Sequence, residues 1–492
     1  LLATPAHAAA SQEEMLRLLE KMNRRLEKLE QRNADLEKKI KIQTAPALES
    51  RVKTLEESQT KIAEGLDSDR ISENEPELTS RLKAVEQDAL SVKKAAKKVE
   101  ALDGLKVGMG LTTVAQRQSG LPQNTPDSNS QLNYRADVTV ELPFAPIGNV
   151  DQKVFAHIRV GQGLGLNPAF DALGGFAAAP NAVAFRVSGA NPDDSVFILG
   201  EAWYQASIPL PFGGYKDHSR EKIEVTAGKI DLFGFFDQNA AAGDETRQFL
   251  NSSFVHNPLL DAGGQIGVDA NGFQPGLIAS YLNETSKPDT WRLSLGVFGT
   301  GPRGSNYQNT LDSPLVIAQA ETARKFGGLT GNYRAYAWQS SKGEEIDGTT
   351  ARHSGFGFSV DQKVGDGLTL FGRYGQQISG KVRFDRALTL GSEINGSYWS
   401  RGGDSIGVAM GFLHASSDYR EAGLRAIDLD NDGITDATFA PSGSEKLAEI
   451  YYRYRISKQF ELSPNFQYIG NLGGNNDAPG VKIYGLRALL AY

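Results

Sequence analysis

Two periodicities divide this chain of 492 residues. Between residues 15 and 40, apolar residues follow one another at spacings of four and three, which is the heptad pattern of a coiled coil. After Gly104 the period becomes two, and the segment 134–142 alternates apolar and polar residues without interruption. The pattern therefore predicts a helical coiled coil followed by an all-β region.

The heptads form three segments, which prolines at positions 46 and 76 separate. Each segment carries an Arg, two apolar core positions and a Glu in the order R-h-x-x-h-E, which resembles the trimerisation motif of short coiled coils. The residues that we expect to direct oligomerisation are Arg25, Leu26, Leu29, Glu30, Arg51, Glu56, Arg81 and Glu86. Asn33 at a core position favours a dimer instead. We predict a homotrimer, with a dimer as the alternative.

The first eight residues end in an A-x-A pattern at Ala6 and Ala8, as secretory signal peptides do. We interpret 1–8 as the remnant of a signal peptide, although an ordinary Ala-rich terminus has the same composition. The expected domains are then this remnant, a periplasmic stalk over 9–104 and a β-barrel over 105–492. An exported protein follows from the first of these.

The polar face of the expected strands carries Arg repeatedly at mid-strand, whereas a soluble barrel keeps charges outside. A membrane barrel turns apolar residues to lipid and charges to a wet lumen. We therefore predict an all-β transmembrane β-barrel of about 16 antiparallel strands, preceded by the α-helical coiled coil, in the bacterial outer membrane. The expected strands are 105–116, 131–143, 151–161, 196–209, 221–231, 274–283, 290–299, 315–323, 328–340, 355–364, 368–378, 387–399, 404–415, 446–456, 459–470 and 480–492.

Aromatic residues near the strand ends suit the interfacial girdles of such a barrel. They are Tyr134, Trp203, Tyr204, Trp291, Trp338, Tyr398 and Trp399. The segment 480–492 ends in Tyr492, which resembles the C-terminal assembly signal of outer-membrane barrels. An even number of strands places both barrel ends on one side, so the stalk is expected in the periplasm.

Composition sharpens this division. No Phe, Tyr or Trp lies before residue 105, and Cys is absent from the whole chain, which excludes disulfides and thiol chemistry. The net charge of −7 gives no footprint for nucleic acid. Mean hydropathy is −0.36, and no apolar run approaches the ~18–20 residues of a membrane-spanning helix.

Long, non-repetitive stretches resemble the OprB-type carbohydrate-selective porins. They are residues 228–239, 244–251 with Asn257-Pro258, 331–338, 384–391 and 449–455. The resemblance implies a sixteen-stranded outer-membrane barrel that passes small sugars by diffusion through a constriction of Arg and acidic residues. The heptad stalk departs from the simplest members of that family.

Sugar selectivity in water needs paired donors, acceptors and aromatic faces, and Arg supplies a planar fork of donors. The residues expected to line the lumen are Arg135, Asp137, Glu141, Arg159, Arg334, Arg373, Glu393, Glu449, Arg453 and Arg455. The alternative is that they only pair with one another in a water-filled channel. The loop residues Asp237, Asp244, Glu245 and Arg247 either form a constriction loop or clamp that loop to the wall.

The segment 428–436 matches D-x-D-x-D-G-x-x-D, in which alternate carboxylates converge on one cation. The Ca²⁺ ligands would be Asp428, Asp430, Asp432, Asp436 and the carbonyl of Ile434. Phe439 stands where an EF-hand has Glu, so an acidic surface turn is the alternative. No nucleophile–base pair and no metal spacing among the six His points to an enzyme.

Two functions remain open. The first is a porin for passive diffusion of small carbohydrates and similar solutes, trimeric through its stalk. The second is a structural tether, in which the stalk reaches peptidoglycan and the barrel is an anchor in outer-membrane lipid or a general-diffusion pore.

Overall fold

The computed structural model describes residue 31 and residues 104–492, except 122–124, 126–129, 173–178, 186–193, 213–218, 261–272, 288, 302–303, 306–308, 310, 424 and 428–436. The chain divides into two units between Ala101 and Leu102. The signal-peptide remnant and nearly all of the stalk lie outside the described residues. So do the oligomerisation residues Arg25, Leu26, Leu29, Glu30, Arg51, Glu56, Arg81 and Glu86, whose roles stay predictions.

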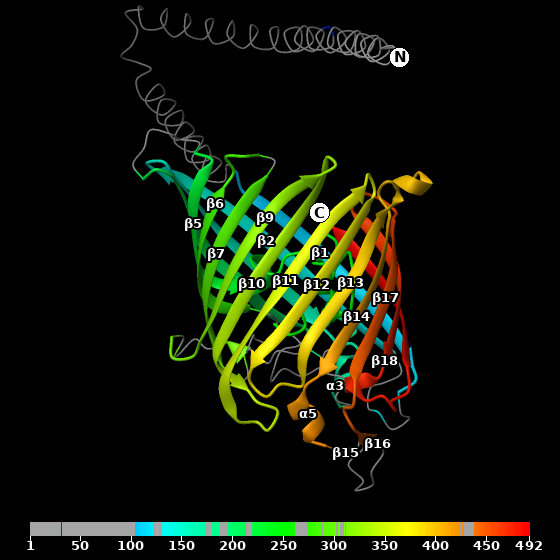
Figure 1. Ribbon diagram of the computed structural model, residues 1–492. Coiled ribbons are helices and arrows are strands. Elements are labelled where there is room, and N and C mark those ends of the chain that lie inside the picture. Colours follow the sequence, from blue (N-terminus) through cyan, green and yellow to red (C-terminus); the bar gives the residue numbers. More distant parts are fainter. Residues whose placement is uncertain are drawn as a thin grey trace, which may run out of the picture. The chain divides into compact units, whose positions relative to one another are not determined.

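Sixteen antiparallel strands form a closed barrel, as the period-two segments predict (Figure 1). They are β1 (Lys106–Ser119), β2 (Ser130–Ile147), β3 (Val150–Gln162), β4 (Val196–Pro209), β5 (Glu221–Asp231), β6 (Phe273–Asn283), β7 (Thr290–Gly301), β9 (Pro314–Phe326), β10 (Leu329–Glu344), β11 (Thr350–Gly365), β12 (Leu368–Ser379), β13 (Phe384–Asn395), β14 (Ser405–Ala415), β17 (Ser444–Arg455), β18 (Phe460–Gly470) and β19 (Val481–Ala491). Each of the sixteen expected strands is confirmed within a few residues of its predicted bounds.

Short elements lie between these strands. They are α3 (Asn167–Ala172), η1 (Leu232–Gly234), α4 (Ser252–Val255), β8 (Gly304–Ser305), η2 (Gly396–Trp399), α5 (Ser417–Glu421), β15 (Arg425–Ile427), β16 (Ala437–Phe439) and η3 (Leu472–Gly474). The expected strand 387–399 was too long at its end, because Asn395 caps η2 by accepting a hydrogen bond from the Ser397 amide. None of the helices in the described part of the chain is long and apolar enough to cross a bilayer.

The barrel closes where β1 pairs with β19. The register runs from Gly110 opposite Ala491 to Ser119 opposite Lys482. Met109 and Tyr492 exchange two further backbone hydrogen bonds, of 3.0 and 2.8 Å. Because lipid offers no partner to backbone groups, a spanning sheet is stable only when such an edge is paired.

Connections differ in length at the two ends of the barrel. The turn between β9 and β10 has two residues, Gly327 and Gly328, whose φ angles of 58° and 84° suit a tight hairpin and disfavour side chains. The connections that include α3, α5 and the β15–β16 hairpin lie at the other end (Figure 1). In outer-membrane barrels the short turns face the periplasm and the long loops face outside.

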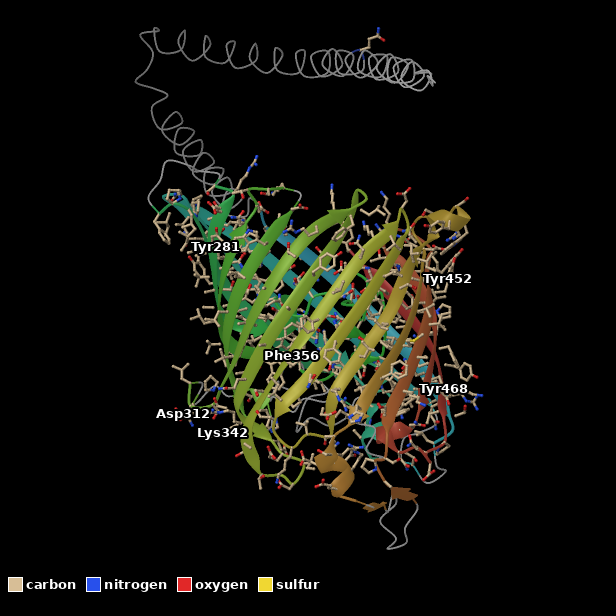
Figure 2. The ribbon with its side chains drawn as sticks, viewed as in Figure 1. Tyr281, Asp312, Lys342, Phe356, Tyr452 and Tyr468 are labelled. Carbon is tan, nitrogen blue, oxygen red and sulfur yellow. The ribbon has the colours of Figure 1, made fainter. Side chains whose placement is uncertain are left out.

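The outward face of the strands is apolar and exposed. Met410 on β14 is 51% exposed, and Phe358 and Leu390 show the same pattern on β11 and β13. Figure 2 shows Phe356 at mid-height on this surface, with Tyr281 and Tyr452 toward the short-turn end and Tyr468 toward the other. This is an apolar band between aromatic girdles, as lipid requires.

Two of the expected girdle residues face the other way. Trp203 and Trp338 are buried on the inner side of the barrel in a cluster with Ile230 and Phe298. The prediction was wrong for this pair because nearness to a strand end does not say which face a side chain takes. A bulge between His157 and Ile158 shifts the β3–β4 register before Trp203, and such bulges re-aim side chains.

We expect Met410→Arg to destabilise the barrel by about 2–4 kcal/mol, because it places a charge near the middle of the lipid-facing band. Equilibrium unfolding in lipid vesicles measures the change. Thr369→Arg on the inner face of β12 is the matched control, with a loss of less than about 1 kcal/mol. Equal losses in both variants would contradict the assignment of faces.

Candidate functional site

Residues 232–260 lie inside the barrel, where they pack against inward side chains of the wall. The side chains of Phe249 and Phe254 are fully buried, and Phe249 lies 5.5 Å from the ring of Phe371 on β12 and 5.0 Å from that of Tyr451 on β17. We call this segment the inner loop. It fills part of the lumen with apolar residues and leaves the remainder to polar ones.

The backbone of the inner loop is hydrogen-bonded by charged side chains of the wall. The Glu449 carboxylate on β17 accepts from the amides of Leu250 at 2.7 Å and Asn251 at 2.9 Å. Arg487 on β19 donates to the carbonyls of Glu245 at 2.8 Å and Gln248 at 2.7 Å. Both wall side chains are almost fully buried. Glu449 thus sits beneath the loop rather than on the open lumen.

A second buried contact holds the start of the loop. The guanidinium of Arg373 on β12 lies 3.0 Å from the Asp237 carboxylate and donates to the Phe254 carbonyl at 2.7 Å. Asp237 also accepts from the Asn257 amide at 2.7 Å and from the Tyr336 hydroxyl at 3.0 Å. The pair is buried on all sides, so both residues clamp the loop to the wall.

Arg135 on β2 joins the loop to the opposite side of the same wall network. It lies 2.8 Å from Glu245 of the loop and 2.8 Å from Asp137, which in turn lies 2.7 Å from Arg159. Burial alone would raise the pKa of the Glu245 carboxyl, but the guanidiniums of Arg135 and Arg159 outweigh it and hold that pKa below its usual value.

Arg334 on β10 belongs to the wall as well. Its guanidinium lies 3.0 Å from Glu321 on β9 and 3.0 Å from Asp361 on β11, and it is buried. Glu141 on β2 is different, because it lies at the short-turn end of the lumen, 2.8 Å from Lys106 and 2.8 Å from Lys153. The structure therefore divides the predicted lining residues into buried ties and accessible groups.

The accessible groups gather on β13, β17 and β18, next to the loop residues 244–247. We call them the lumen cluster; its members are Asp244, Arg247, Glu393, Arg453, Arg455 and Glu461. Their charges lie 3.6–3.9 Å apart, which is longer than a hydrogen bond. Asp244 and Arg247 are each 40% exposed.

Hydrogen-bonding capacity in this cluster is incomplete. Within the part of the chain that the structure describes, Arg453 Nε and Glu461 Oε2 have no hydrogen-bond partner. Glu393 accepts from the Tyr451 hydroxyl at 2.9 Å and from Gln248 at 3.2 Å, while its second oxygen faces Arg453 at 3.9 Å. Donors and acceptors that are close but unsatisfied can bind a solute that carries both kinds of group.

Sequence reasoning missed several residues of this site. Arg487 and Glu461 were not among the predicted residues, although the alternation along 481–491 and 460–470 places both on the inner face. His157, which lies 2.8 Å from Asp137, was recognised as inward but given no role. The inner-face parity was the available signal in all three cases.

The predicted calcium ligands Asp428, Asp430, Asp432, Ile434 and Asp436 lie outside the described residues. Among the residues that the structure describes, no group of three or more His, Asp or Glu side chains is arranged to hold a metal ion. Calcium binding therefore stays a prediction of the sequence.

A closed sixteen-stranded barrel with an apolar outer face and a loop folded into a charged lumen defines an outer-membrane diffusion channel of the porin class. The sequence signature described as "carbohydrate-selective porin, OprB family" matches residues 182–492. The chain belongs to this family, as its resembling stretches predict, and fold and family are those of a non-enzymatic channel in the bacterial outer membrane.

Solved structures show the same fold. The high-pH structure of Pseudomonas putida OprB aligns with a TM-score of 0.63 and 20% identity over 81% of this chain and 97% of that one. The low-pH structure of the same protein gives 0.46 and 15% over 81% and 96%. The outer membrane channel DcaP of Acinetobacter baumannii gives 0.43 and 11% over 79% and 97%. A comparison with curated proteins finds no match.

We expect Glu449→Ala to loosen the inner loop, because the amides of Leu250 and Asn251 lose a buried charged acceptor, which costs about 1.5–3 kcal/mol per bond. Single-channel recordings should show higher and noisier conductance, and limited proteolysis should cleave within 232–260. Glu141→Ala, at the short-turn end, is the control and should change neither readout. An unchanged conductance in Glu449→Ala would show that this carboxylate does not position the loop.

A pH effect follows from Glu245. Because its pKa is lowered in the folded protein, its attraction to Arg135 is fully present above the ordinary value of 4.5 and is lost as pH falls through the lowered pKa. Conductance should therefore be constant from neutral pH to about 4.5 and rise below it. Glu245→Gln should show the raised conductance at every pH, whereas Asp347→Asn at the long-loop end should behave as the native protein. A pH profile that is the same with and without Glu245 would refute this role.

Proposed function

We propose that this channel selects small carbohydrates, and that solutes contact the lumen cluster as they pass the inner loop. The observation that carries the proposal is the incomplete pairing of Arg247, Arg453 and Glu461 at distances of 3.6–3.9 Å from their counter-charges. A sugar offers hydroxyl groups that donate and accept at once, so it can bridge a guanidinium and a carboxylate held that far apart. Membership of the carbohydrate-selective family supports the same solute class.

The buried ties explain how selectivity would be maintained. Arg373, Arg487 and Glu449 hold the inner loop from three strands, so the loop residues Asp244 and Arg247 keep a fixed position against β17 and β18. A preformed site pays less conformational entropy for each solute that it binds. Arg135, Arg334 and Arg373 act in this proposal as positioning residues, not as solute contacts.

Sugar block of the ion current tests the proposal. We expect a titratable block by mono- and disaccharides, and Arg453→Ala should weaken it about tenfold, since a hydrogen bond to a charged group contributes about 1.5–3 kcal/mol. Arg324→Ala, on the outer surface near the short turns, is the control and should leave the block unchanged. Amino acids of similar size should block less than sugars.

Two results would count against sugar selectivity. The first is a current that sugars do not affect at any concentration. The second is an Arg453→Ala channel whose sugar affinity equals that of the native channel, because the lumen cluster would then have no part in binding.

The stalk supports a second role, as a trimerisation device and as a tether toward peptidoglycan. Its support is the sequence pattern, namely three heptad segments that each carry the R-h-x-x-h-E motif. Deleting residues 13–100 should convert a trimer to smaller species and abolish co-sedimentation with peptidoglycan. For the acidic loop, calcium should raise the thermal stability of the native protein but not that of Asp430→Asn/Asp432→Asn.

A further inference from the structure

The outer surface of the barrel carries unpaired positive charge at its long-loop end. Arg117 on β1, Lys446 on β17 and Lys482 on β19 are exposed, and each alternates with buried inward residues of its strand. Within the part of the chain that the structure describes, none of these three cations has an ion pair or a hydrogen-bond partner. Neither the solutes of the lumen nor the inner loop can reach them, since they face outward.

The strand register brings these cations together. Arg117 lies opposite Tyr484, and Lys482 is two residues from Tyr484 on the same face, so Arg117 and Lys482 are diagonal neighbours at ~7–8 Å. Lys482 lies opposite Tyr468, and Lys446 lies opposite Gly470 on the same strand, β18. Arg386, opposite His414, extends the row, although Asp385 at 3.5 Å partly offsets its charge.

Two aromatic residues fix the depth of this row in the membrane. Tyr484 and Tyr468 are 56% and 40% exposed among the cations, and Figure 2 shows Tyr468 projecting from the outer surface near the long-loop end. Aromatic girdles mark the level of the lipid headgroups. Positive side chains at that level meet the polar groups of the outer leaflet.

An apolar groove descends from the same place. Arg117, Leu132, Tyr484 and Leu486 line an open groove of about 540 Å³. A second groove of about 760 Å³ shares Leu132 and continues along Leu111 and Leu164. Leu111 and Arg117 are six residues apart on β1, which is ~20 Å along a strand. Charge at the headgroup level therefore lies above an apolar surface long enough for a lipid chain.

We propose that this face, over β1, β2 and β17–β19, binds a phosphorylated glycolipid of the outer leaflet. Its phosphates lie against Arg117, Lys482 and Lys446, and its acyl chains occupy the grooves around Leu132. Charge complementarity selects this occupant, because like charges held at ~7–8 Å repel unless an anion lies between them. The short-turn end lacks this arrangement at its outward cation Arg324, which is paired with Asp289 at 3.4 Å.

The test uses the full chain in detergent with diphosphoryl lipid A as the probe, and native mass spectrometry and thermal unfolding as readouts. The native protein should retain bound lipid and unfold at a higher temperature with it. Arg117→Gln/Lys446→Gln/Lys482→Gln should bind at least tenfold more weakly. Lys287→Gln/Arg324→Gln/Lys325→Gln, which removes three charges at the short-turn end, should bind as the native protein does.

Two further arms separate the sources of binding. Dephosphorylated lipid A should bind more weakly than the diphosphoryl form, and inorganic phosphate at the same concentration should not displace the lipid. Leu132→Trp, which keeps every charge and fills both grooves, should also lower lipid affinity. Heat-modified migration on gels shows whether each variant still forms a folded barrel.

The proposal is overturned if the triple variant at the long-loop end binds the lipid as tightly as the native protein. Equal binding of the dephosphorylated lipid, or full competition by inorganic phosphate, also overturns it. If the triple variant instead changes the oligomeric state and keeps its lipid affinity, the face is an interface between copies of the chain and not a lipid site.

Discussion

A backbone buried inside a barrel must have its amides and carbonyls hydrogen-bonded, and much of this lumen is organised by that requirement. The inner loop lacks a neighbouring strand over most of its length, so wall side chains take the place of one. Glu449 accepts from two successive amides, and Arg487 donates to two carbonyls on the same stretch of chain. These ionised side chains act as backbone partners, which explains why they can be buried without a solute.

This requirement separates two kinds of charge that look alike in a sequence. Arg373 and Arg453 both alternate with apolar residues at the inner face of a strand. Arg373 is surrounded by a loop carboxylate and a loop carbonyl within 3.0 Å, whereas Arg453 meets its counter-charge only at 3.9 Å. The first is committed to holding the loop, and the second has donor capacity to spare for a passing solute. Selectivity in such a channel depends on the residues that the fold leaves incompletely paired.

Most of the architecture was predictable because a barrel strand has local causes. Period-two alternation set the strands, and the repeated Arg at inner positions set which side faces water. The partners of the inner loop were not predictable, because Leu250 and Glu449 are 199 positions apart and no local pattern links them. Trp203 failed for a related reason, since the bulge that turns it inward arises from the pairing of β3 with β4. The sequence therefore identified the lining residues as a group but did not separate ties from contacts.

The pairing of β1 with β19 joins segments that are 381 positions apart, from Gly110 to Ala491. That contact has a high cost in chain entropy and forms late in any folding sequence. Until it forms, two strand edges are unpaired, and hydrocarbon does not tolerate unpaired edges. Membrane insertion and closure of this barrel are for that reason one event rather than two. A cell that makes this protein must keep the chain out of the lipid until its first and last strands can meet.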